Sequence, residues 1–135
     1  MTAAIGTRVV IPMAPDASLN PNARVHWARR AKAIRELRRA AWAAAYDARG
    51  AFADQPLAVE VCICWPRGRK RLDADNATAC IKAALDGLTD AGVWWDDRSI
   101  ERLTVRQERL DRVGNATWPG GCIVIDVQEV AAGAV

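Results

Sequence analysis

The stretch RLDADNATACIKAALDGLTDAGVWWDD, residues 71–97, joins a predicted helix to two clusters of aspartate. It contains six aspartates and one lysine, although the whole chain has a formal net charge of +3. Asp and Asn at the start of this stretch can accept hydrogen bonds from the free N–H groups of a first helical turn. The pattern predicts a helix from the DADN cluster to about Ala91, ended by Gly92, with an apolar stripe formed by Ala77, Ile81, Ala84, Leu85 and Leu88.

The remaining elements follow from periodicity on either side of this helix. Alternation predicts strands at 5–12, 57–65, 100–109 and 122–128. A second, longer helix is predicted at about 25–48, with its arginines facing away from a buried stripe of Trp27, Ala31, Ile34, Leu37, Ala41 and Ala44. We therefore expect one compact α+β domain over residues 1–135, with a small mixed sheet and two main helices.

Composition excludes several classes of protein. A chain of 135 residues is long enough for a real hydrophobic core without a disulfide or metal staple. No segment approaches the length of a membrane span, and the N-terminal apolar run is too short for a signal peptide, so we expect a cytoplasmic protein with no membrane partner. The cysteines lack C-x-x-C spacing and the chain has one histidine, which predicts reduced, mostly buried thiols at Cys62, Cys64, Cys80 and Cys122.

Positive charge is concentrated in two segments. From Arg24 to Arg49 there are seven arginines and one lysine, and RGRKR at 67–71 adds four cations directly before the acidic stretch. Such clusters are typical of surfaces that bind a polyanion, although a basic helix face can also be merely solvated. The candidate DNA-contacting residues are Arg24, Arg38, Arg39, Arg67, Arg69, Lys70 and Arg71.

The predicted helix determines the directions in which the acidic side chains project. At 100° per residue, Lys82 and Asp86 lie within about 20° of Asp75, opposite the apolar stripe. Asp73 would point the same way, and an ordinary return of the chain would bring Asp97 to the start of the helix. Carboxylates about 4 Å apart repel by roughly 4 kcal/mol per pair at an effective dielectric near 20. A divalent cation such as Mg²⁺ would offset this repulsion and could also bind a phosphodiester.

Simpler explanations exist for each feature taken alone. A D-x-D-N before a helix is often only a cap, and two aspartates in a turn are often only solvated. Trp94 and Trp95 could stack on bases or on a partner, but packing is the commoner use of tryptophan in a small domain. The combination of both acidic clusters with a basic flank favours a metal site.

The same stretch resembles a known family. The motifs DADN at 73–76, KAALDGLTDAG at 82–92 and WDD at 95–97 resemble those of the RusA family of Holliday junction resolvases. The likeness is close over about 67–103. Outside that range, Pro15, Ser18 and Asn20 resemble a Pro/Ser/Asn loop that follows the first strand in the family, which makes Asn20 a further candidate for DNA contact.

The resemblance implies roles for particular residues. Asp73, Asp75 and Asp97 would be the catalytic carboxylates that bind Mg²⁺ or Mn²⁺, and Lys82 would be the essential lysine. Many members have lysine three residues after the motif's asparagine, where this chain has Ala79, about 60° and 4.5 Å from Lys82 on a helix. The residues placed to support this site are Asn76, Asp86 and Asp96.

The resemblance also implies a function. We expect a metal-dependent endodeoxyribonuclease that resolves four-way DNA junctions by paired symmetric nicks, in recombination and repair. Two matched nicks require two sites, so a homodimer is implied, and an apolar strand edge near 57–65 is one candidate for its interface. The alternatives are a branched-DNA-binding module without cleavage and a metal-dependent nucleotide phosphohydrolase.

Overall fold

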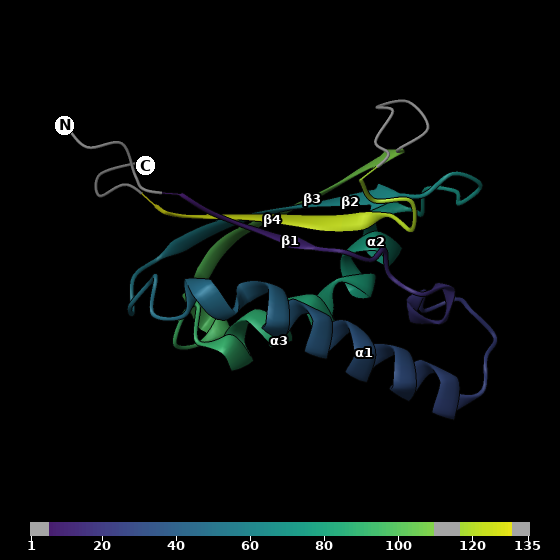
Figure 1. Cartoon of the computed structure of the whole chain (residues 1–135), viewed down its shortest axis with the longest axis horizontal. Helices are drawn as coiled ribbons and strands as arrows, with labels where there is room; N and C mark the ends of the chain where they lie inside the picture. The colour runs from purple at the N-terminus through teal and green to yellow at the C-terminus, as the bar shows by residue number, and fades with distance from the viewer. Residues whose placement is uncertain (1–5, 110–116, 131–135) are drawn as a thin grey trace.

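The computed structural model, which describes residues 6–109 and 117–130, has one four-stranded sheet with its helices on one face (Figure 1). The strand order is β1-β4-β2-β3; β2 and β3 are parallel, whereas β4 is antiparallel to both β1 and β2. This arrangement confirms a single compact α+β domain with a small mixed sheet and two main helices. The elements in chain order are β1 (Thr7–Ile11), η1 (Ala17–Leu19), α1 (Trp27–Ala45), η2 (Tyr46–Ala48), β2 (Leu57–Trp65), α2 (Ala74–Cys80), α3 (Lys82–Ala91), η3 (Asp97–Ser99), β3 (Ile100–Arg109) and β4 (Cys122–Glu129).

The strand β2 lies in the interior of the sheet. Its alternation is as predicted, because Leu57, Val59, Val61 and Ile63 are buried in the main core beneath the sheet. The intervening cysteines belong to a smaller cluster that also contains Cys122. Both edges of β2 are hydrogen-bonded, to β3 and to β4. The idea that two subunits pair through the edge at 57–65 is therefore wrong.

The long helix α1 packs through its smallest residues. Trp27 and Ile34, which were expected in the buried stripe, are 75% and 41% exposed. Leu37 and Ala41 are buried as predicted, and they share the buried face with Ala33 and Ala45, each four residues from the next. Small side chains allow α1 to approach α3 closely. The side of α1 that can pack closely is therefore the buried one, even though larger apolar residues lie on another side.

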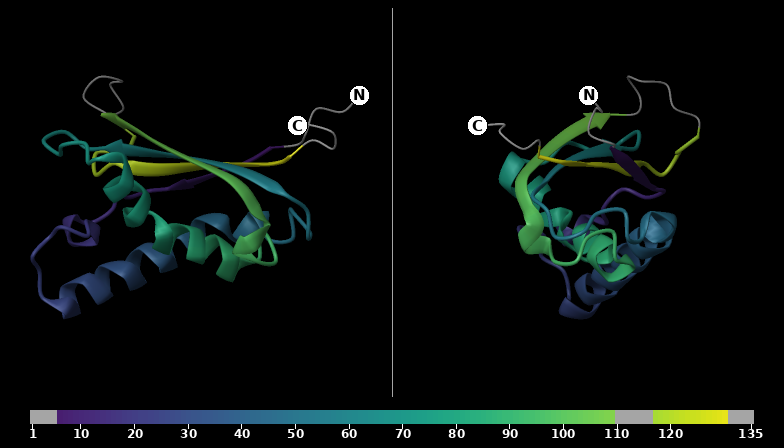
Figure 2. Two further views of the ribbon diagram at one scale, coloured as in Figure 1. Left: turned by 180° about the vertical axis from the view of Figure 1, so that it is seen from behind. Right: turned by 90° about the vertical axis from the view of Figure 1, so that its left-hand side faces the viewer.

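The helices α2 and α3 form the crossover between the two parallel strands (Figure 2). A parallel connection must carry the chain from the end of β2 back to its start, and a helical segment on one face of the sheet does this. The predicted single helix is divided at the buried Ile81, whose φ and ψ of −99° and 3° depart from helical values. Gly92 ends α3 with φ 77°, and its N–H donates to the carbonyls of Leu88 and Thr89, as its sequence position predicted.

The other sequence predictions were largely accurate. The first strand covers Thr7–Ile11, within the predicted range 5–12, and the strands predicted at 100–109 and 122–128 are β3 and β4. All four cysteines are buried and unbridged. Within 6–109 and 117–130, no helix has the combined length and apolar character needed to cross a bilayer.

Candidate active site

The first acidic cluster lies where the chain enters α2. Asp73 occupies the N-cap position of α2, but its side chain makes no capping hydrogen bond, and Asp75 lies in the first turn. Both side chains are exposed. The explanation that Asp73 serves only as a helix cap is therefore not supported, because its carboxylate accepts no hydrogen bond from the first turn of α2.

Gln107 of β3 holds the entrance to this helix in place. Its Oε1 accepts from the backbone N–H of Leu72 at 2.8 Å, and its Nε2 donates to the Leu72 carbonyl at 2.8 Å. The indole Nε1 of Trp65 donates to the same Oε1 at 2.8 Å. Because Leu72 directly precedes Asp73, these bonds attach the acidic cluster to the last residues of both β2 and β3. Gln107 was not among the residues predicted from the sequence, although it shares the strand face of the half-buried Val105.

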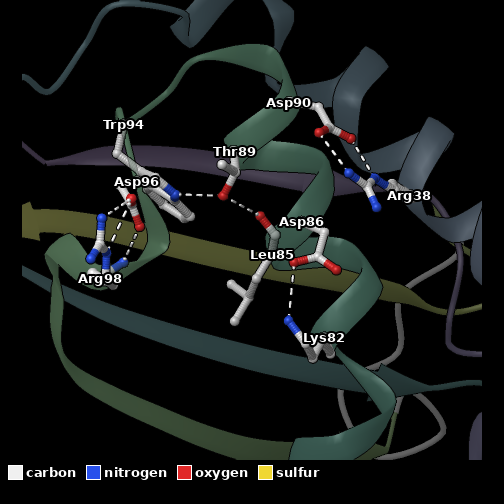
Figure 3. Close-up of polar contacts among 9 residues, drawn as sticks. All are labelled: Arg38, Lys82, Leu85, Asp86, Thr89, Asp90, Trp94, Asp96 and Arg98. Atoms are coloured by element: carbon white, nitrogen blue, oxygen red, sulfur yellow. Dashed lines mark hydrogen bonds and ion pairs between the residues drawn. The ribbon is translucent and has the colours of Figure 1, made fainter.

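The second acidic cluster lies in a tight turn before β3. Asp96 accepts hydrogen bonds from the backbone N–H of Arg98 at 2.9 Å and from its guanidinium at 3.0 and 3.2 Å (Figure 3). The guanidinium first, and the backbone N–H second, lower the pKa of Asp96 to about 2. Asp97 is the first residue of η3 and is exposed. Asp96 therefore orders the turn that presents Asp97.

The two clusters lie at opposite ends of the crossover. Leu72 is attached to Gln107, whereas Asp97 precedes Ile100, which pairs with Leu57 at the start of β2. Gln107 lies seven positions after Ile100 along β3, which corresponds to about 23 Å at roughly 3.3 Å per residue. Among the described residues, the carboxylates of Asp73, Asp75 and Asp97 do not form a group within 4.8 Å. The expected return of Asp97 to the helix start is therefore wrong, because β2 and β3 are parallel and the crossover ends far from where it began.

The remaining predicted residues lie along the crossover. Lys82 begins α3, and its Nζ donates to Asp86 Oδ1 at 3.2 Å, so these two residues share one side as predicted (Figure 3). The Lys82 side chain is 72% exposed and can still reach a ligand. The break at Ile81 separates it from the helix that carries Asp75, so a straight helical wheel does not relate the two positions. Asn76 is half-buried in α2.

The other group that could hold a metal ion lies away from the aspartates. In the described part of the chain, the ligand atoms of Cys62, Cys64 and Glu108 lie within 4.8 Å of one another. A hydrogen bond with Cys64, together with burial, raises the pKa of Cys62, and Glu108 already accepts from the Arg106 guanidinium. Protonated thiols suit Mg²⁺ poorly, whereas the exposed carboxylates of Asp73, Asp75 and Asp97 are the hard oxygen donors that it prefers.

The cations of segment 67–71 differ in their contacts. Arg67, Lys70 and Arg71 are exposed beside the first acidic cluster. Arg69 is half-buried, donates to the Pro15 carbonyl at 2.9 Å, and lies over the Trp65 ring at 4.7 Å from its centroid. Arg69 therefore joins the N-terminal loop to the end of β2, and the three exposed cations remain the better placed for a phosphate.

The cations of the N-terminal half divide in the same way. Arg38 donates two hydrogen bonds to the Asp90 carboxylate, at 2.5 and 2.8 Å, and so joins α1 to α3. Arg24 and Arg39 are exposed. Asn20 accepts from the backbone N–H of Asn22 at 3.0 Å, which is the contact of a turn-forming residue.

The two adjacent tryptophans differ in burial. Trp94 is buried, as the packing prediction required, whereas Trp95 is 70% exposed.

Together these features define a class: a small α+β domain with a parallel β-α-β crossover, exposed aspartates at both of its ends, and exposed cations beside the first of them. Comparison with known families identifies the group within this class. Residues 12–120 match the family model described as endodeoxyribonuclease RusA. The chain belongs to the RusA family of endodeoxyribonucleases. An uncharacterized protein from Xylella fastidiosa (strain Temecula1 / ATCC 700964) is 38% identical over 106 residues, which cover 74% of this chain and 67% of that protein.

Proposed function

We propose that this protein is a metal-dependent endodeoxyribonuclease that resolves four-way DNA junctions by paired symmetric nicks. The observation that carries the proposal is the pair of exposed carboxylates at Asp73 and Asp75, in a member of this family. They lie beside the cations of 67–71 and directly follow Leu72, whose backbone is hydrogen-bonded to Gln107. Asp97 is the third proposed ligand. Oxygen donors of this kind suit Mg²⁺ or Mn²⁺.

The proposed chemistry is the hydrolysis of a phosphodiester. A bound divalent cation would lower the pKa of a water molecule and neutralise charge on the scissile phosphate. Arg67, Lys70 and Arg71 hold the DNA backbone next to the carboxylates. The Lys82 ammonium, restrained by Asp86, stabilises negative charge on the phosphate as the attacking oxygen adds. The ordering contacts of Asp96 keep Asp97 available as a ligand.

The proposed setting is DNA recombination and repair in the cytoplasm, with a homodimer acting on each junction. A junction has approximate two-fold symmetry, so a closed two-fold dimer supplies two matched sites. Arg24, Arg39 and Asn20 are proposed to contact the arms of the junction. In this scheme Arg38 and Arg69 support the DNA-binding surface through their protein contacts rather than by binding phosphate.

The substitution Asp75→Asn tests the proposal. We expect the rate of cleavage of a labelled four-way junction to fall by at least about a hundredfold. Removing a residue that only supports a metal ligand usually costs about 10- to 100-fold, so a loss of this size indicates a direct ligand. Junction binding should be unchanged or tighter, because the substitution removes negative charge near phosphate. The exposed Asp47 of η2 provides the matched control, and Asp47→Asn should cleave normally.

The assay compares four-way junction, linear duplex and single strand, each with Mg²⁺ or with a chelator. Cleavage by the Asp75→Asn protein at the wild-type rate contradicts the metal site. Tight junction binding by the wild-type protein without metal-dependent cleavage indicates a branched-DNA-binding module instead. Hydrolysis of free nucleotides with no cleavage of any DNA indicates a nucleotide phosphohydrolase.

A further inference from the structure

The face of the sheet opposite the helices carries a cluster of three cysteines. Cys62 and Cys64 alternate with the core residues of β2, and Cys122 of β4 pairs with Cys64 in the antiparallel register. All three side chains are buried, and Trp118, which precedes β4, packs against them. The thiols are therefore held together and shielded from water on the face of the sheet away from α1, α2 and α3 (Figure 1).

A carboxylate lies beside these thiols. Glu108 of β3 pairs with Cys64 in the parallel register, so Cys64 has Cys122 on one side and Glu108 on the other. The sulfur atoms of Cys62 and Cys64 are 3.9 Å apart, and both lie within 4.8 Å of a Glu108 carboxylate oxygen. The Glu108 side chain is 43% exposed, so it forms the solvent side of the cluster. Three sulfur donors and one oxygen donor thus come together from three strands.

We propose that Cys62, Cys64, Cys122 and Glu108 bind one Zn²⁺ ion, at a site separate from the aspartates and independent of nuclease activity. Zn²⁺ takes four ligands in a tetrahedron, with thiolate sulfur at about 2.3 Å and carboxylate oxygen at about 2.1 Å. Two sulfurs on such an ion are about 3.8 Å apart, which matches the 3.9 Å between Cys62 and Cys64. Thiolate ligands favour Zn²⁺, whereas Mg²⁺ requires an all-oxygen set.

Arg106 supplies the supporting contact that such a site needs. Its guanidinium donates to Glu60 at 2.8 Å and also to Oε1 of Glu108, and Arg106 pairs with Cys62 in the register of β2 and β3. Carboxylates that bind a metal are usually hydrogen-bonded by a further group, which fixes their orientation. The contact with Oε1 leaves the other oxygen of Glu108 for the ion. The guanidinium charge also offsets the net negative charge of three thiolates and a carboxylate around a divalent cation.

A bound ion would join three strands at one end of the sheet. Cys64 is the second-last residue of β2, Glu108 is the second-last of β3, and Cys122 is the first of β4. The same end carries Gln107, whose side chain holds the entrance to α2. The ion would therefore stabilise the part of the sheet from which the basic segment 67–71 leaves.

Cobalt titration tests for thiolate ligands directly. Co²⁺ replaces Zn²⁺ in tetrahedral sites, and only a thiolate site gives the sulfur-to-cobalt charge-transfer absorption. We expect metal-free protein, with its thiols confirmed as reduced, to develop this absorption up to one Co²⁺ per chain and to lose it when Zn²⁺ is added. The Asp75→Asn protein should give the same titration, because its altered carboxylate belongs to the other proposed site. Reduced parent protein that shows no charge-transfer absorption overturns the proposal.

The fourth cysteine provides a matched control. Cys64 and Cys80 are both buried, but Cys80 belongs to α2 and lies outside the cluster. Cys64→Ala should weaken Co²⁺ binding by more than about a hundredfold, beyond the loss expected for a residue that only supports a ligand. Cys80→Ala should bind as the parent does. Unchanged binding by Cys64→Ala, or an equal loss in both proteins, contradicts the assignment.

A second pair of variants avoids changes in buried residues. Glu108→Gln and Glu60→Gln each remove a carboxylate that is bonded to Arg106, and the two glutamate side chains are 43% and 50% exposed. Glu108→Gln should bind Zn²⁺ at least about tenfold more weakly, whereas Glu60→Gln should bind it normally. Addition of Zn²⁺ should therefore raise the melting temperature of the parent and of Glu60→Gln more than that of Glu108→Gln. Equal responses in the two variants would show that Glu108 is not a ligand and that the proposed site is wrong.

Discussion

Gly87 is the point of closest approach between α3 and α1. A Cβ at this position would lie 2.5 Å from the Arg38 carbonyl oxygen and 2.6 Å from the Ala41 Cβ. Both neighbours belong to the backbone or to a side chain that cannot rotate away. The requirement for glycine here explains why α1 presents the small Ala41 to α3 at this point.

Replacing this glycine should separate the two helices. We expect Gly87→Ala to lower the free energy of unfolding by about 1–3 kcal/mol, the usual cost of overpacking in a close-packed interior, despite the better helix propensity of alanine. Denaturant unfolding followed by circular dichroism measures the change. Gly120→Ala is the control, since a Cβ at residue 120 would have no atom within 4 Å. A Gly87→Ala protein as stable as the parent would mean that the helices can move apart without cost.

The helices α1 and α3 are also joined by a charged contact. Arg38 donates two hydrogen bonds to Asp90, and these lower the pKa of the Asp90 carboxyl from its ordinary value of 3.8 (Figure 3). The side chains are 48% and 38% exposed, so the contact is modest in strength. A lowered pKa in the folded protein means that the contribution to stability is complete above the unfolded value and is lost as the pH falls through the folded value.

This contact therefore predicts a pH-dependent difference between two proteins. At pH 7, Asp90→Asn should be slightly less stable than the parent, because it loses the charged partner of Arg38. The difference should shrink below about pH 4 and disappear once Asp90 is protonated in the folded state. Urea unfolding at a series of pH values measures it. A difference that stays constant down to pH 2 would show that the charge of Asp90 does not contribute.

At the scale of the whole molecule, paired and exposed cations should contribute differently to DNA binding. Log affinity for a junction should fall linearly with log salt concentration, with a slope set by the number of phosphates neutralised. Arg71→Gln should reduce that slope by about one, since Arg71 is exposed beside the first acidic cluster. Arg38→Gln should leave the slope unchanged, because the Arg38 guanidinium is hydrogen-bonded to Asp90.

Fluorescence anisotropy between 50 and 300 mM salt, roughly the range over which such slopes are linear, separates the two cases. Equal slopes for all three proteins would place the DNA elsewhere on the surface.

Periodicity within single segments carried most of the information about the fold. The alternation of β2, the extent of α1 and the Gly92 end of α3 were predictable because each depends on residues close together in the chain. The same holds for the acidic motifs and their basic flank, which are contiguous patterns. The apolar face of α1 was predicted correctly at Leu37 and Ala41 and incorrectly at Trp27 and Ile34, because burial depends on which side of α1 approaches α3, a different element.

The arrangement of the acidic clusters in space depended on contacts between distant segments. The parallel pairing of β2 with β3 and the attachment of Leu72 to Gln107 each join residues that are 35 or more positions apart. Neither contact therefore produces a periodic pattern in the sequence. Parallel pairing sends the crossover away from its starting point, and so it separates Asp97 from Asp73 by most of the length of a strand. The position of β3 at the edge of the sheet arises in the same way, because the place of a strand in a sheet follows from the order of pairing and not from its own residues.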